Sequence, residues 1–102
     1  MRLPLPCLVL PFLVACGSPA KDMDAICAEH TAAKAGTGDY AGLSGDKLQI
    51  TLARNITGKV SSSEIKAALA TMSAAPPEQR YQLWQNAARE AGVEGWSCPA
   101  ME

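Results

Sequence analysis

The apolar run near the start of the chain limits how much of its 102 residues can take part in a folded domain. Arg2 is followed by residues 3–14, which are almost all apolar. A helix needs about 20 apolar residues to cross a bilayer, so this run is too short to span a membrane. Pro4, Pro6 and Pro11 also remove backbone donors that a spanning helix requires. The run therefore predicts a secretory leader that is not retained as a membrane helix.

The run ends in Leu13, Val14, Ala15 and Cys16. A leucine, a variable position, a small residue and a cysteine in this order resemble the lipobox of bacterial lipoproteins. The resemblance implies that a signal peptidase cuts before Cys16, that residues 1–15 are removed and that Cys16 carries the lipid. It covers only these first sixteen or so residues. The alternative is an ordinary secretory leader cut near Ala15, which would leave Cys16 unmodified.

The same resemblance implies a place in the cell. In bacterial lipoproteins the cysteine thiol takes a diacylglycerol, and the freed amine often takes a further acyl chain such as palmitate. Each buried methylene contributes ~0.8 kcal/mol, so several chains together hold a protein firmly on a membrane. In this family, an aspartate directly after the cysteine often signals retention in the inner membrane. Here Gly17 and Ser18 follow the cysteine instead. The expected location is the bacterial cell envelope, with the outer membrane favoured over the inner and the domain facing the periplasm or the cell surface.

The remaining sequence is long enough for one small domain. Of nine lysines and arginines, Arg2 lies in the leader, so eight basic residues face ten acidic ones and the net charge is minus two. A nucleic-acid-binding surface needs clustered basic residues, whereas the lysines here are spread among acidic residues. We therefore expect no nucleic-acid partner. Asp22, Asp24 and Glu29 are expected to be solvated on an exposed helical face.

The composition favours an all-α fold, because alanine is abundant while β-branched and aromatic residues are few. Residues 16–21 are expected to form a lipidated tether and residues 22–102 a small helical domain. The first helix is predicted to begin at Asp22 as N-cap and to end at Gly36. A loop over residues 36–42 follows and presents Tyr40 as an exposed aromatic residue.

Three further helices are predicted from their capping residues and apolar spacing. The second runs from Ser44 to about Thr57, with Gly58 at its end. The third begins with a capping box formed by Ser61 and Glu64, flanked by Val60 and Ile65 as a hydrophobic staple. The fourth starts at Pro76-Pro77 and ends at Gly92, with Trp84 on its buried face. The sequence thus predicts a four-helix domain with antiparallel neighbours.

Two cysteines remain once Cys7 leaves with the leader and Cys16 is lipidated. In the oxidising compartment that export implies, Cys27 and Cys98 are expected to form a disulfide. Closing a loop of this length would stabilise the domain by ~4.4 kcal/mol in the chain-entropy model. The disulfide would also hold the C-terminal tail against the first helix, leaving Trp96 either packed over it or exposed as a binding anchor.

An alternative is a metal site formed by Cys27, His30 and Cys98. Cys27 and His30 share a helical face at their spacing. However, these residues supply at most three ligands, and no second paired motif completes a closed zinc site. We therefore predict no metal and no other cofactor, with His30 as a half-buried structural residue.

The sequence has no recognisable catalytic motif. It contains a single histidine, and most serines lie where helices are predicted to begin. The glycine-rich residues 36–45 lack the Gly-Lys-Ser/Thr ending of a phosphate-binding loop. We therefore predict that the protein is no enzyme but a membrane-anchored lipoprotein that acts as an envelope accessory or protein-interaction module, with an envelope protein as its partner. The alternative is a periplasmic lipoprotein that binds a small ligand or a metal through Cys27, His30 and Cys98.

Overall fold

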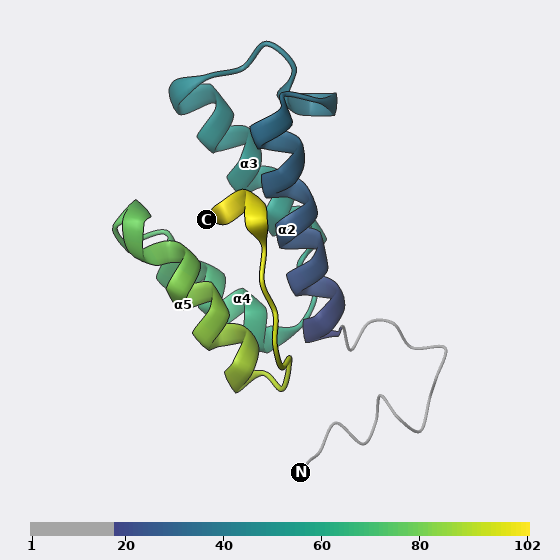
Figure 1. Cartoon of the computed structure of the whole chain (residues 1–102), viewed down its shortest axis with the longest axis vertical. Coiled ribbons are helices and arrows are strands. Elements are labelled where there is room, and N and C mark those ends of the chain that lie inside the picture. Colours follow the sequence, from purple (N-terminus) through teal and green to yellow (C-terminus); the bar gives the residue numbers. More distant parts are fainter. Residues whose placement is uncertain (1–17) are drawn as a thin grey trace.

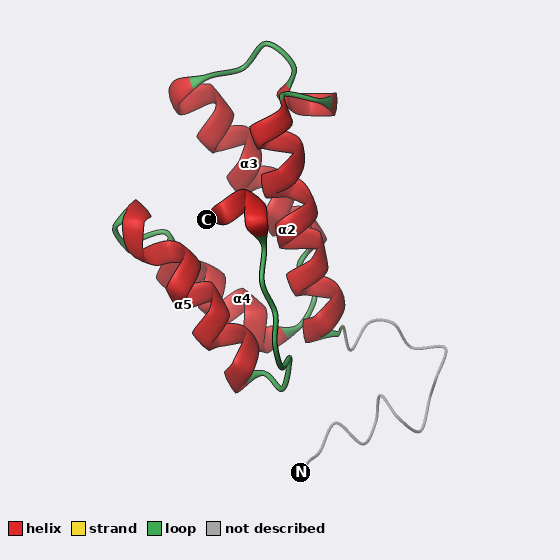
Figure 2. Ribbon diagram, in the orientation of Figure 1, coloured by secondary structure: helices red, strands yellow, loops and turns green. Residues whose placement is uncertain are grey.

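The computed structural model describes residues 18–102, which form four α-helices and two short 3-10 helices, with no strand among them (Figures 1 and 2). The elements in chain order are α2 (Pro19–Ala35), η2 (Gly38–Tyr40), α3 (Gly45–Lys59), α4 (Ser63–Met72), α5 (Pro77–Glu90) and η3 (Pro99–Met101). The predicted all-α, four-helix fold is confirmed. The predicted leader and Cys16 lie outside the described residues. Within the described residues, no helix combines the length and the apolar character that crossing a membrane would require.

Helix α2 begins earlier than expected. Ser18 is its N-cap, and the Ser18 hydroxyl accepts a hydrogen bond from the Lys21 amide (3.4 Å). Pro19 occupies the first turn, where the amide that proline lacks would have no helical partner. The predicted start at Asp22 was wrong, and Pro19–Lys21 belong to the helix rather than to a tether. The N-cap of α2 therefore lies two residues after Cys16 in the sequence.

The segment between α2 and α3 folds more tightly than a flexible loop. Gly36 ends α2 in the left-handed conformation (φ 71°), as predicted. The short helix η2 then turns Tyr40 into the core, where it is only 2% exposed. The expectation of an exposed Tyr40 was wrong. Ser44 precedes α3 as predicted, but α3 continues through Gly58 to Lys59, because a glycine weakens a helix without having to end it.

The start of α4 differs from the prediction by one residue. Ser62 is the N-cap, and its hydroxyl accepts a hydrogen bond from the Ile65 amide (3.4 Å). The predicted capping box with Ser61 as cap was wrong, because Ser61 bonds to Asp22 instead. Val60 and Ile65 are nevertheless both buried in the core.

Helix α5 follows its prediction closely. It begins after Pro76, and its end is marked by Gly92 (φ 89°) and by a hydrogen bond from the Val93 amide to the Ala88 carbonyl (2.8 Å). Trp84 lies in the core and is 3% exposed. This C-terminal turn sends the chain back toward α2.

Two antiparallel helical hairpins share one core. Helices α2 and α3 form the first hairpin, α4 and α5 form the second, and the C-terminal tail runs between α5 and α2 (Figure 1). The buried core draws on both hairpins and consists of Met23, Ile26, Tyr40, Leu52, Ile56, Val60, Ile65, Met72, Trp84 and Ala88. The tail packs against α2 through η3 and runs between the two hairpins.

Candidate functional site

The tail is joined to α2 by the predicted disulfide. The Cys27 and Cys98 Sγ atoms are 2.10 Å apart, and their Cα atoms are 5.5 Å apart. Cys98 is fully buried, whereas Cys27 is half-buried on α2. Because each sulfur is bonded to the other, neither is a thiolate that binds a metal in this state.

His30, the third residue of the alternative metal site, hydrogen-bonds within its own helix. Its Nδ1 lies 2.9 Å from the Ile26 carbonyl oxygen, and the ring is half-buried as predicted. Burial lowers the pKa of His30 below its ordinary value, because desolvation disfavours the imidazolium. Across residues 18–102, no group of three or more histidine, cysteine, aspartate or glutamate residues is placed to hold a metal ion.

Trp96 is packed rather than presented as a free anchor. Its indole Nε1 donates a hydrogen bond to the Met23 carbonyl (3.2 Å). Its ring meets Tyr81 edge to face, with centroids 6.1 Å apart. The Tyr81 hydroxyl in turn accepts a hydrogen bond from the Cys98 amide (3.0 Å). Together with the disulfide, these contacts fix the tail to both α2 and α5.

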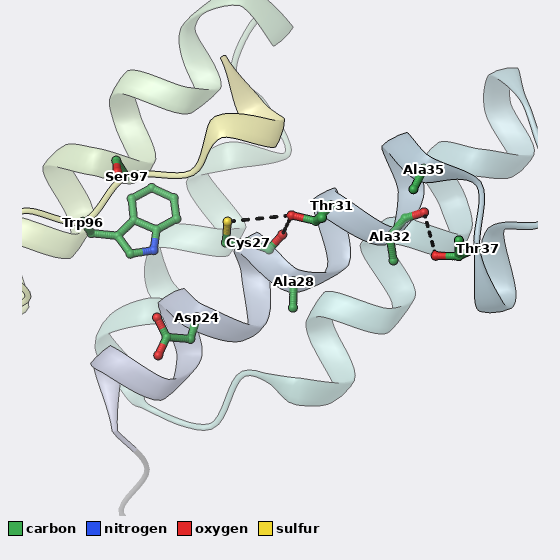
Figure 3. Close-up of a pocket in the computed structure, with 9 residues that line it drawn as sticks. All are labelled: Asp24, Cys27, Ala28, Thr31, Ala32, Ala35, Thr37, Trp96 and Ser97. Carbon is green, nitrogen blue, oxygen red and sulfur yellow. Dashed lines mark hydrogen bonds between the residues drawn. The ribbon is translucent and has the colours of Figure 1, made fainter.

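An open surface hollow lies beside the disulfide, and we call it the α2 hollow (Figure 3). Its volume is about 530 Å³. Its lining is Asp24, Cys27, Ala28, Thr31, Ala32, Ala35, Thr37, Trp96 and Ser97. Most of these side chains are small and belong to one face of α2, while Trp96 and Ser97 come from the tail. Asp24 is the one side chain of this lining that carries a charge at neutral pH, and no nucleophile is paired with a base.

A cluster of polar side chains lies between α2, η2 and α3. Glu29 is only 7% exposed and receives a hydrogen bond from the Tyr40 hydroxyl (2.7 Å). Asn55 donates to the same carboxylate oxygen (3.4 Å), and Lys59 forms an ion pair with the other oxygen. We call these four residues the Glu29 cluster. The prediction that Glu29 is solvated on an exposed face was wrong.

The Glu29 cluster is electrostatically satisfied. The hydrogen bond from Lys59 is the main cause that holds the pKa of Glu29 below its ordinary value of 4.5. Burial, followed by the hydrogen bond to Glu29, raises the pKa of Tyr40 to about 12. A general base works best with a pKa near the working pH, whereas Glu29 is shifted away from neutrality. The arrangement therefore suits a fixed connection between helices rather than proton transfer.

Asp22 makes a similar connection at the other end of α2. It is 2% exposed, and its carboxylate accepts hydrogen bonds from the amides of Ser61 (3.1 Å) and Ser62 (2.8 Å). The Ser62 hydroxyl donates to it as well (2.6 Å). Asp22 thus satisfies free amides at the start of α4 rather than at the start of its own helix. Of the three acidic residues expected on an exposed face, only Asp24 is exposed.

Part of this arrangement has a signal in the sequence. Asp22, Ile26 and Glu29 follow one another at steps of four and three, so both acidic residues share a helical face with a core residue. That spacing indicates buried carboxylates, which require partners. Their partners are Ser61 and Ser62 for Asp22, and Tyr40, Asn55 and Lys59 for Glu29, all too distant in the chain for any local pattern to identify.

Comparison of the chain with protein-family models, with curated proteins and with solved structures finds no match.

Proposed function

We propose that this protein is a bacterial lipoprotein, anchored in a membrane of the cell envelope through Cys16, and that its helical domain acts as an accessory or protein-interaction module. The observation that carries the proposal is the position of Leu13, Val14, Ala15 and Cys16 at the end of an apolar run and just before Ser18, the N-cap of α2. A leader that is cut before Cys16 would leave almost the whole mature chain within the folded domain.

The disulfide supports an exported protein. Disulfides persist in oxidising compartments and are rare where thiols are kept reduced. Cys27 and Cys98 are paired in the fold, while Cys16 stands apart from them at the end of the predicted leader. The two cysteines of the described residues thus serve the fold, and the lipid is assigned to Cys16 by the lipobox alone. Gly17 and Ser18 after the cysteine favour the outer membrane over the inner, and the domain faces the periplasm or the cell surface.

The α2 hollow is the surface that we assign to an envelope protein partner. Its small side chains allow another chain to approach the α2 backbone closely. Trp96 is hydrogen-bonded to Met23, but it is only half-buried and still lines the hollow. Tryptophan is enriched among the residues that contribute most to protein interfaces. The Glu29 cluster, in contrast, has its polar groups occupied by one another.

The anchor is tested by Cys16→Ser in the full chain. We expect this variant to lose incorporation of labelled palmitate and to accumulate as the uncut precursor, since the modified thiol is missing. Cys7→Ser is the matched control, because Cys7 belongs to the predicted leader and should leave both lipid labelling and cutting unchanged. Normal cutting and lipid labelling of Cys16→Ser would contradict the proposal.

The partner is tested by photo-crosslinking in intact cells. A photoreactive amino acid at Ala28 lies in the α2 hollow, and the same amino acid at Lys66, which is exposed on α4, serves as the control. We expect an adduct with an envelope protein from position 28 and none from position 66. Uncrosslinked monomer from both positions would contradict the interaction role and leave the lipid anchor standing.

A further inference from the structure

We infer that the lipidated protein is held with one end against the lipid headgroups, and that this end is formed by the first turn of α2, the α3–α4 junction and the turn after α5. We call it the anchor end. The inference rests on the lipidation of Cys16 proposed above. The opposite end, which carries the α2–α3 loop, then stays away from the membrane.

The first step is the length of chain between the lipid and the fold. Ser18 is fixed to α2, because its hydroxyl accepts from the Lys21 amide (3.4 Å) and its carbonyl accepts from the Asp22 amide (2.9 Å). Cys16 precedes Ser18 by two residues. An extended chain advances by at most ~3.6 Å per residue, so the Cα atom of Cys16 lies within about 7 Å of that of Ser18. A lipid on Cys16 therefore attaches directly at the start of α2.

The second step is which other segments share this end. The carboxylate of Asp22, in the first turn of α2, holds the amides of Ser61 and Ser62 at the α3–α4 junction. Trp96, which follows the turn over residues 92–95, donates to the Met23 carbonyl (3.2 Å). Figure 1 shows the start of α2, the start of α4 and the end of α5 at the same end of the molecule. These bonds make the anchor end one rigid surface.

The third step is the chemistry of that surface. Its exposed charged side chains balance: Lys21 and Lys59 are basic, and Glu64 and Glu94 are acidic, so there is no excess of positive charge toward anionic lipids. Within residues 18–102, the one large hydrophobic side chain that is strongly exposed is Ile50, on α3 (62%). The anchor end thus has neither the exposed large apolar side chains that would insert into the bilayer nor the positive charge that would bind anionic lipids. Apart from Ile50, no flank of the described domain exposes a large hydrophobic side chain that would hold the domain on its side. The short attachment alone keeps the anchor end near the lipid.

The consequence is a defined distance for the rest of the domain. Helix α2 has 17 residues, which span about 25 Å at 1.5 Å per residue. The α2–α3 loop is therefore held roughly one helix length from the headgroups. The α2 hollow extends along α2 between the two ends, from Asp24 near the anchor end to Thr37 near the loop, so a partner reaches it from the side.

The test places a photoreactive amino acid at Glu94, in the anchor end, or at Ala41, in the exposed part of the α2–α3 loop. Each full-length lipoprotein is purified and incorporated into vesicles of phosphatidylethanolamine and phosphatidylglycerol. After illumination, mass spectrometry detects phospholipid adducts and the acyl chains on Cys16. We expect phospholipid adducts from position 94, and from position 41 only the background signal.

A flexible linker of 20 Gly and Ser residues between Gly17 and Ser18 is the matched variant. Such a linker spans about 25 Å on average, which is comparable to the length of α2, so it should abolish the difference between the two positions. Equal adducts from both positions of the unextended protein, with Cys16 lipidated, would overturn the orientation and leave the proposed anchor intact. A Cys16 without acyl chains would overturn both.

Discussion

At the scale of single residues, two carboxylates on α2 carry much of the specificity of the fold. Asp22 and Glu29 are both buried, and each binds groups that lie far away in the chain. A buried carboxylate is costly unless hydrogen bonds satisfy it, so each one stabilises only the arrangement that brings its partners to it. The two residues therefore fix where α4 begins and how α3 lies against α2.

Asp22→Ala should destabilise the domain by about 3 kcal/mol, because it leaves the Ser62 amide in a buried position without its acceptor and also removes the charge-assisted bonds. Urea unfolding followed by circular dichroism measures the loss. Asp24→Ala is the control, because Asp24 is exposed two residues further along the same helix and should change stability by less than about 0.5 kcal/mol. Equal effects of the two substitutions would contradict the role of Asp22.

Acid should destabilise the domain in two steps. Burial lowers the pKa of His30 in the folded domain below 6.5, its ordinary value. As the pH falls below 6.5, His30 of the unfolded chain is protonated before His30 of the folded domain, so the free energy of unfolding decreases. The pKa of Glu29 is lowered below 4.5, mainly by Lys59, so its contribution is complete above pH 4.5 and is lost as the pH falls through the lowered value.

Urea unfolding at a series of pH values tests both steps. His30→Gln should remove the loss of stability that begins below pH 6.5, since His30 is the single histidine of the chain. Glu29→Gln should reduce the slope below pH 4.5 and leave the first step in place. A first step of unchanged size in His30→Gln would show that another group takes up that proton.

At the scale of elements, the sequence predicted the helices better than their ends. The apolar spacing and the prolines and glycines were enough to locate all four helices. The start of α4 was missed by one residue, because Ser61 and Ser62 are both good caps and the choice between them depends on Asp22, about forty residues earlier. The predicted exposure of Tyr40 is wrong for the same reason: its hydrogen-bond partner Glu29 belongs to another element.

The residues of the candidate site also differ in how far the sequence could predict their contacts. The pairing of Cys27 with Cys98 was predictable because few cysteines remain after the leader and an exported chain favours their oxidation. The Glu29 cluster was not predictable, since it draws one residue from η2, two from α3 and one from α2. Local patterns specify helices and their caps, whereas a buried polar cluster depends on how whole helices pack.

The tail should depend on its disulfide. The double variant Cys27→Ala/Cys98→Ala should lose up to ~4.4 kcal/mol of stability. The disulfide joins cysteines that are 71 residues apart in the sequence, and without it the unfolded chain gains conformational entropy. Urea unfolding with and without a reducing agent measures this. Reductant should lower the stability of the natural protein toward that of the double variant and leave the double variant unchanged. Insensitivity of the natural protein to complete reduction would contradict a stabilising role of the disulfide.

At the scale of the whole molecule, the two hairpins are joined by one core rather than by a linker. Ile26 of the first hairpin and Ile65 of the second are both fully buried in the same cluster. Asp22, the disulfide and Trp96 add three connections from α2 to α4 and to the tail. Neither hairpin can leave the other without exposing core residues and breaking these connections, which requires the domain to unfold as a unit.

Trp84 fluorescence and circular dichroism together test whether the two hairpins unfold in one cooperative transition. In Trp96→Phe, which keeps an aromatic ring beside Tyr81, the fluorescence of selectively excited tryptophan reports only on Trp84 in the second hairpin. Circular dichroism reports on all the helices. For the oxidised variant we expect the two signals to give the same midpoint in urea, because Trp84 packs in the core that the first hairpin completes. A lower midpoint for fluorescence than for circular dichroism would mean that the α4–α5 hairpin opens while α2 and α3 remain folded. That outcome would also divide the anchor end into two independent parts. The α3–α4 junction is held to α2 by the hydrogen bonds from the Ser61 and Ser62 amides to Asp22, and opening of the α4–α5 hairpin would break these bonds.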